Sequence, residues 1–122
     1  MGGLYKLPAG RGGGVPYDLY EVTSSSLTHS YRLEPGAPEK EPGVGDEAAA
    51  GTRLGALVHQ NHFGTVSVDW DAREVTLELV ASDDCGLAAQ AWGEQCVAHE
   101  GAAGQTLKGI TLGIDELSGR RR

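Results

Sequence analysis

The chain has 122 residues, 39% of them hydrophobic and 6% aromatic, which is enough for one small domain with a thin core. Its formal net charge of −7 argues against a nucleic-acid partner, because phosphates attract a basic surface. We expect no membrane span, since no apolar stretch approaches the roughly 18 residues that cross a bilayer. We also find no apolar region typical of a secretory signal near Met1, and the compartment stays open.

The first predicted elements are a leader and a strand that ends in a hydroxyl-rich turn. Residues 1–16 contain six glycines and two prolines, which predicts a flexible leader. From Tyr17 to Val22 the side chains alternate as in a strand covered partly on both faces. The Thr and Ser residues that follow are typical of a helix N-cap, so we expect one helical turn from Leu27 to Tyr31.

The middle of the chain contains a loop and then a hairpin. Residues 33–52 carry three prolines and five acidic residues, which predicts a mobile surface loop. Residues 53–58 fit either a strand or a packed loop. Apolar and polar residues then alternate in residues 62–70 and again in residues 74–81, with a short turn between the two runs. Such a pattern predicts two half-buried strands in an antiparallel hairpin.

The last third of the chain is less regular. Residues 87–103 are rich in Ala and Gly, which indicates a loop with one or two helical turns. Ile110, Leu112 and Ile114 then alternate with smaller residues and predict a final strand. Residues 118–122 form a basic tail, which we interpret as solvated. The expected fold class is α+β, mainly β, built from antiparallel strands.

Side chains that could act chemically are few. A hydrolytic metal centre needs several carboxylates and imidazoles close together, and the pair His59 and His62 does not supply enough ligands. His29 follows a serine run, but no Gly-x-Ser-x-Gly elbow is present. Packing or surface histidines and turn-forming hydroxyls are therefore favoured. The aspartates at both ends of the hairpin are interpreted as turn residues. Trp70 and Trp92 are interpreted as core or edge packing. The sequence does not decide whether Cys85 and Cys96 form a disulfide or remain two thiols.

Two segments resemble a known enzyme family. The run Leu19-Tyr20-Glu21-Val22-Thr23-Ser24-Ser25-Ser26-Leu27-Thr28-His29-Ser30 resembles a segment near the C-terminal end of PhoD-like phosphatases, which are calcineurin-like metallophosphoesterases. The run Asn61-His62-Phe63-Gly64-Thr65-Val66-Ser67-Val68-Asp69-Trp70 is similar to the start of that family's closing hairpin. The segments 73–81 and 110–117 are similar to its following strands. The likeness extends over residues 17–81 and more loosely over residues 105–117, which together are roughly two-thirds of the chain.

The resemblance implies the C-terminal strands of a metallophosphoesterase-type β-sandwich, and an incomplete domain within residues 17–117. The intact family protein hydrolyses small phosphoesters with bound divalent metal ions. This chain lacks the family's upstream Gly-Asp-x-His motif, and Ser26 replaces the usual Gly. The resemblance therefore assigns no catalytic residue and no metal ligand here. It implies only that Thr23, Ser24, Ser25 and His29 line the substrate pocket of the intact enzyme. The alternative hypothesis is a small free-standing β-rich binding or structural module without catalysis.

Overall fold

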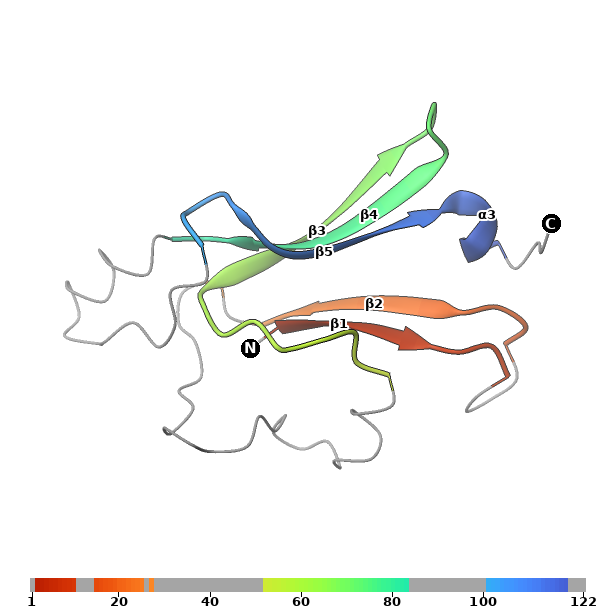
Figure 1. Ribbon diagram of the computed structural model, residues 1–122, viewed down its shortest axis with the longest axis horizontal. Helices are drawn as coiled ribbons and strands as arrows, with labels where there is room; N and C mark the ends of the chain where they lie inside the picture. The colour runs from red at the N-terminus through yellow and green to blue at the C-terminus, as the bar shows by residue number, and fades with distance from the viewer. Residues whose placement is uncertain (1, 11–14, 26, 28–51, 84–100, 119–122) are drawn as a thin grey trace.

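The chain forms two antiparallel sheets and one short helix (Figure 1). This computed structural model describes residues 2–10, 15–25, 27, 52–83 and 101–118. The elements are β1 (Gly2–Leu7), β2 (Leu19–Ser24), β3 (His62–Asp69), β4 (Glu74–Ala81), β5 (Thr106–Gly113) and α3 (Ile114–Leu117). β1 pairs with β2, and the second sheet has the order β3-β4-β5. The prediction of a mainly β chain with antiparallel strands is confirmed.

β3 and β4 form the predicted hairpin. Their register places Val66 opposite Leu77 and Val68 opposite Val75, so the apolar residues of both strands share one face. The turn between the strands is held by Asp69, whose Oδ1 accepts a hydrogen bond from the Ala72 backbone N–H at 2.8 Å. This is the turn role expected of an aspartate at a hairpin end.

β5 pairs with the other edge of β4, with a register shift between Leu79 and Val80. The predicted final strand is thus confirmed up to Gly113, but its extension to Ile114 is wrong, because Ile114 begins α3. Two acidic residues, Asp115 and Glu116, occupy the first turn of this helix. Negative charge is favourable there, next to the unpaired N–H groups of a helix N-terminus.

The prediction of a flexible leader is wrong for Gly2–Leu7, because these residues form β1, a strand with partners on both sides. On one side β1 pairs with β2, with Leu4 opposite Val22. On the other side Gly2 and Val58 exchange backbone hydrogen bonds of 2.9 and 2.8 Å. These hydrogen bonds and the complete burial of Leu4 outweigh the low strand propensity of glycine. Residues 11–14 lie outside the described part of the chain.

The hydrophobic core lies between the two sheets. Leu4 from β1, Leu77 from β4 and Leu112 from β5 form its buried centre. Tyr20 and Val22 of β2 pack against this cluster, whereas Leu19 on the other face is 41% exposed, so β2 is covered on one face and not on both as predicted. Residues 53–58 are a packed segment with isolated bridges to β1 rather than a regular strand, and Leu57 and Val58 are buried in it. One small core therefore connects elements from both ends of the chain.

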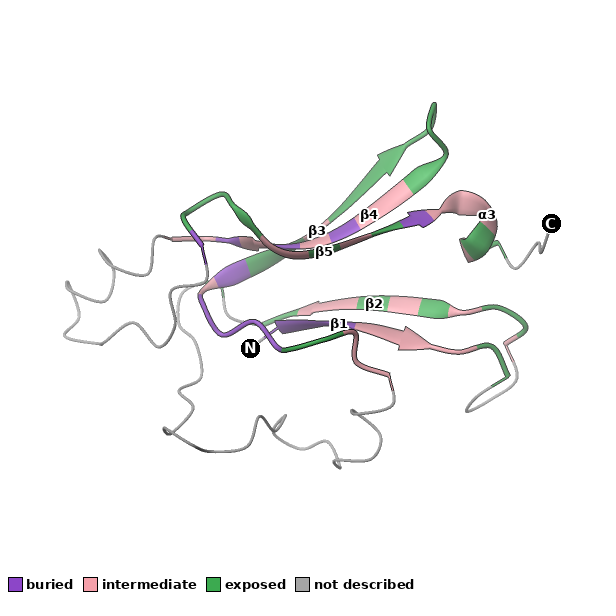
Figure 2. Ribbon diagram, viewed as in Figure 1, coloured by how far each residue is buried: buried purple, intermediate pink, exposed green. Residues whose placement is uncertain are grey.

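β3 differs from the prediction of a half-buried strand. Val66, Val68 and the adjacent Trp70 are 61%, 43% and 76% exposed, and most of β3 is exposed in Figure 2. The interpretation of Trp70 as a packed side chain is therefore wrong. The physical reason is the lack of cover and not the edge position alone, since β5 is also an edge and supplies Leu112, whereas no residue of β3 belongs to the core cluster or packs against it. Val66 and Val68 lie on the side of β3 that faces the core, but the two-stranded sheet does not cover them.

Other expectations fall outside the described residues. These are the helical turn after Leu27, residues 33–51 of the predicted loop, residues 87–100 with Trp92 and Cys96, Cys85 just before that segment, and residues 119–122 of the tail. Within the part of the chain that the structure describes, no helix is long and apolar enough to cross a membrane.

Candidate functional site: the end of β2 and a charged cleft

The hydroxyl-rich end of β2 lies against the beginning of β3. Ser24 Oγ donates a hydrogen bond of 3.2 Å to the backbone carbonyl oxygen of His62. Thr23 Oγ1 instead donates to the Glu21 carboxylate on its own strand. Ser25 follows directly after β2, while His29 lies outside the described residues. Of the four predicted pocket-lining residues, the structure thus places three at one junction.

Two buried polar side chains, His62 and Gln60, form a polar layer next to this junction. His62 is fully buried, and its Nδ1 lies 2.6 Å from the backbone carbonyl oxygen of Gln60, so Nδ1 carries the donated proton. An ideal Cβ on Gly2 would overlap His62 Nε2 and lie 2.8 Å from the Thr23 carbonyl oxygen. Only glycine fits where β1 passes this ring. His62 is thus a packing residue, as the sequence favoured.

Gln60 is the centre of this layer and was not identified from the sequence. Its side chain is 1% exposed and makes three hydrogen bonds to backbone groups of Asp83 and Gly101 within the described part of the chain. Nε2 donates to the carbonyl oxygens of Asp83 at 2.7 Å and Gly101 at 2.6 Å, and Oε1 accepts from the Gly101 N–H at 2.9 Å. A single glutamine therefore fastens the end of β4 to the segment that leads into β5. No local motif marks such a residue, because its partners lie 23 and 41 residues away.

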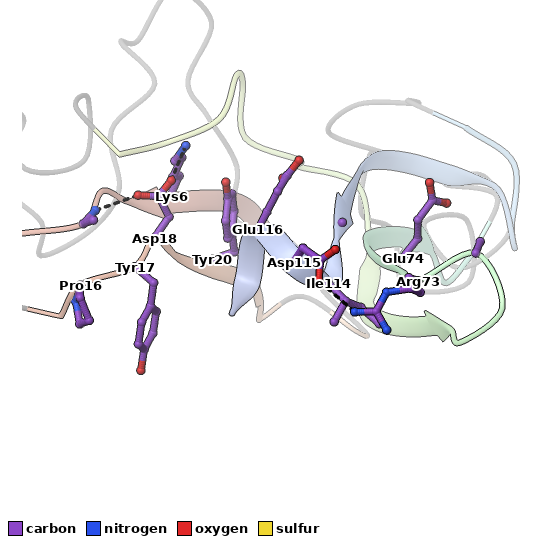
Figure 3. A pocket seen from close by; sticks show the side chains of 13 residues that line it. Lys6, Pro16, Tyr17, Asp18, Tyr20, Arg73, Glu74, Ile114, Asp115 and Glu116 are labelled. Atoms are coloured by element: carbon purple, nitrogen blue, oxygen red, sulfur yellow. Dashed lines mark hydrogen bonds and ion pairs between the residues drawn. The ribbon is translucent and has the colours of Figure 1, made fainter. Parts of the chain in front are cut away.

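A polar cleft of about 650 Å³ lies at the other end of β2 (Figure 3). It is lined from three directions: the β1–β2 end, the β3–β4 turn, and the junction of β5 with α3. Two ion pairs stand in it, Lys6 with Asp18 at 2.8 Å and Arg73 with Asp115 at 2.9 Å. Neither Thr23 nor Ser24 nor Ser25 lines this cleft.

The cleft is more acidic than basic. Glu74 and Glu116 add two carboxylates to the two ion pairs. The hydrogen bond to the Asp18 carboxylate, followed by that to Tyr20, raises the pKa of Lys6 above its ordinary value of 10.5. The Lys6 ammonium also lies 5.5 Å from the centre of the Tyr20 ring, within the range of a cation–π contact. Both basic groups therefore already have partners within the chain.

Among the residues that the structure describes, no group of three or more His, Cys, Asp or Glu side chains could hold a metal ion. Comparison with protein-family models, with curated proteins and with solved structures finds no match to this chain.

Proposed function

We propose that this chain corresponds to the C-terminal part of a PhoD-like metallophosphatase whose intact form hydrolyses small phosphomonoesters or phosphodiesters. In this proposal the chain supplies part of a metallophosphoesterase-type β-sandwich and a turn beside the substrate pocket. The divalent metal ions and their ligands belong to the rest of the enzyme. The chain alone carries no catalytic residue.

One observation carries the proposal: the two segments that resemble the family are neighbours in space. They are separated by about 30 residues in sequence, yet the Ser24 hydroxyl donates to the His62 carbonyl. Gly64 also lies beside β2, since an ideal Cβ on it would stand 3.3 Å from Val22 Cγ2. Two likenesses that meet at one junction support a shared origin better than two scattered ones. In this proposal Thr23, Ser24 and Ser25 lie at the rim of a substrate pocket that the rest of the enzyme completes.

The sequence upstream of Met1 in the gene tests the origin of the chain. We expect an open frame that encodes a Gly-Asp-x-His motif and further Asp, Asn and His motifs. An in-frame stop codon close to Met1, or an unrelated domain before it, would refute the proposal.

An assay of the purified chain tests the division of roles. We expect no hydrolysis of p-nitrophenyl phosphate or bis-p-nitrophenyl phosphate above the buffer blank with Ca²⁺, Mn²⁺ or Fe³⁺ added. Turnover that depends on added metal and is abolished by EDTA would show that the chain itself is catalytic.

A second candidate function is a free-standing β-rich binding or structural module. It is favoured by the core, because Leu4, Leu77 and Leu112 come from both sheets and all belong to this chain. This candidate predicts a single cooperative thermal transition of the isolated chain, whereas an incomplete domain should melt broadly or aggregate.

A further inference from the structure

Among the described residues, only Ser24 occupies the free backbone edge of β3, at the His62 carbonyl oxygen, and the rest of this edge lacks the features that usually protect an edge strand. The eight residues of β3, His62–Asp69, contain no Lys, no Pro and only one acidic residue, Asp69. Natural edge strands usually carry such charges, prolines or bulges because an open row of backbone N–H and C=O groups recruits other strands. The register shift of this sheet lies between β4 and β5, on the far side from the β3 edge.

Two of the exposed apolar residues of β3, Val66 and Val68, lie on one face of the strand, while Phe63, which is 38% exposed, lies on the other. Val66 and Val68 point to the core side of the sheet, since they stand opposite Leu77 and Val75. Trp70, next along this alternation, is 76% exposed. An open backbone edge and an uncovered apolar face thus occur together on β3, as in a strand that continues into a larger sheet.

We propose that β3 pairs antiparallel with β3 of a second copy of this chain, around a two-fold axis at Ser67, to form one continuous six-stranded sheet. Opposite residues of an antiparallel pair share a face, so any register that joins apolar to apolar residues must pair even-numbered positions with even-numbered ones. Centring on Ser67 satisfies this condition and pairs Val66 with Val68 of the second copy.

Two further pairs of this register are also complementary. Trp70 falls opposite Gly64 of the second copy, where no side chain obstructs the indole ring, and aromatic residues stabilise edge glycines in this way. On the other face Thr65 falls opposite Asp69. The Thr65 hydroxyl has no hydrogen-bond partner among the described residues, and a change of its χ1 angle would let it donate to that carboxylate. No two like charges stand opposite each other.

Neighbouring registers are less complementary. Centring on Val66 would place Asp69, which is part of β3, opposite the Phe63 ring, whereas the Ser67-centred register places only Asp71 of the following turn there. Centring on Val68 would shorten the overlap and leave Gly64 outside the pair. The Ser67-centred register therefore uses the features of β3 best.

The size of the interface indicates a weak dimer. Trp70, Val66 and Val68 together expose on the order of 300 Å² of side-chain surface per copy, since a large aromatic residue alone can bury on the order of 200 Å². With the paired backbone the total approaches about 1,000 Å², the lower limit for a specific interface. We expect a dissociation constant on the order of 10–100 μM. Because each copy carries a net charge of −7, added salt should strengthen the dimer.

Sedimentation velocity from 5 to 500 μM tests the dimer. The wild-type chain should shift from monomer to dimer over this range, and Val66→Lys should raise the dissociation constant at least about 10-fold, as an edge lysine opposes strand pairing. Thr111→Lys is the matched control, because it adds the same charge at an exposed site on β5 and should leave the dimer unchanged. Trp70→Ser is a second variant at an exposed site, and circular dichroism verifies that each variant is folded.

Cysteine cross-linking tests the register. In a background with Cys85 and Cys96 replaced by Ser, Ser67→Cys should form a covalent dimer on oxidation with diamide, because position 67 meets itself across the axis. Thr65→Cys should not, because it faces position 69. A monomer at every concentration, equal dimerisation of Val66→Lys and wild type, open-ended growth instead of a closed dimer, or equal cross-linking of both cysteine variants would each overturn the proposal. A monomer whose β3 amides become protected from hydrogen exchange only when a separate catalytic part is added would assign the edge to that part instead.

Discussion

Removal of the Gln60 side-chain amide should destabilise the fold more than any exposed polar substitution. Gln60→Met keeps the length of the side chain but eliminates all three hydrogen bonds to Asp83 and Gly101. Gly101 is buried, so its N–H and C=O would lose their partner with little access to water. A buried polar group left unsatisfied costs about 1–3 kcal/mol.

The magnitude follows from counting the groups that are left unpaired. The two buried backbone groups of Gly101 and the part-buried carbonyl of Asp83 suggest a total of roughly 3–5 kcal/mol, reduced by the favourable burial of the methionine. For a domain of this size each kcal/mol lowers the melting temperature by about 4–8 °C. We therefore expect Gln60→Met to melt at least about 10 °C below wild type. Hydrogen exchange at the Gly101 amide should accelerate at the same time, since its acceptor is gone.

Gln105 offers a matched control for this experiment. Its Oε1 accepts one hydrogen bond of 3.0 Å from the Ala102 N–H at an exposed site. Gln105→Met should change the stability by less than about 1 kcal/mol, because water replaces the lost bond. A Gln60→Met variant that melts within about 3 °C of wild type, or a Gln105→Met variant that is equally destabilised, would refute the reasoning from burial.

Three further predictions follow from the geometry of the sheets and the cleft. Gly2→Ala should destabilise the fold by about 1–3 kcal/mol in chemical denaturation, because the added methyl group overlaps the buried His62 ring. Because the pKa of Lys6 is raised in the folded chain, its ion pair with Asp18 stabilises the fold below pH 10.5, and this contribution is lost as the pH rises through the folded-state pKa. Asp18→Asn should lower the pKa of Lys6, as measured by NMR titration of the ammonium group. At Arg73, where φ is 57°, substitution by Gly should leave stability nearly unchanged, because the relief of backbone strain offsets a half-exposed ion pair, whereas Arg73→Val should be destabilising.

Each of these predictions has a control or a contrary outcome. Gly113→Ala places its Cβ no closer than 3.8 Å to other atoms and should be nearly neutral, in contrast to Gly2→Ala. An unchanged Lys6 pKa in Asp18→Asn would remove the hydrogen bond as the cause of the shift. Equal stability of the glycine and valine variants at position 73 would show that the backbone there is not strained.

The strands that could be predicted from the sequence are those with a local pattern. β3 and β4 alternate apolar and polar residues on either side of a short turn, so their pairing was predictable from neighbours in the chain. β5 was predictable from its alternation only between Ile110 and Gly113, which is the second half of the strand. β1 was not, because it begins with two glycines and gains its stability from β2 and Val58, which lie far away in sequence.

The candidate site was predictable only in part. The hydroxyl run marked the end of β2 correctly, but no pattern indicated that Ser24 would reach the carbonyl of His62. The burial of Gln60 and the assembly of the cleft likewise depend on the packing of several elements. Alternation also failed to show that Val66 would be exposed, since a strand pattern tells which residues share a face and not whether another layer covers that face.

The position of Leu4 has a consequence for the order of folding during synthesis. Leu4 leaves the ribosome well before its core partners Leu77 and Leu112, which are made much later in the chain. The two sheets therefore cannot bury their shared core until β5 has been translated. Until then the hydrophobic residues of β1 remain exposed in an unfolded chain. A nascent chain stalled before Leu112 should remain sensitive to protease throughout its first sheet, and it should become resistant only after β5 has been released.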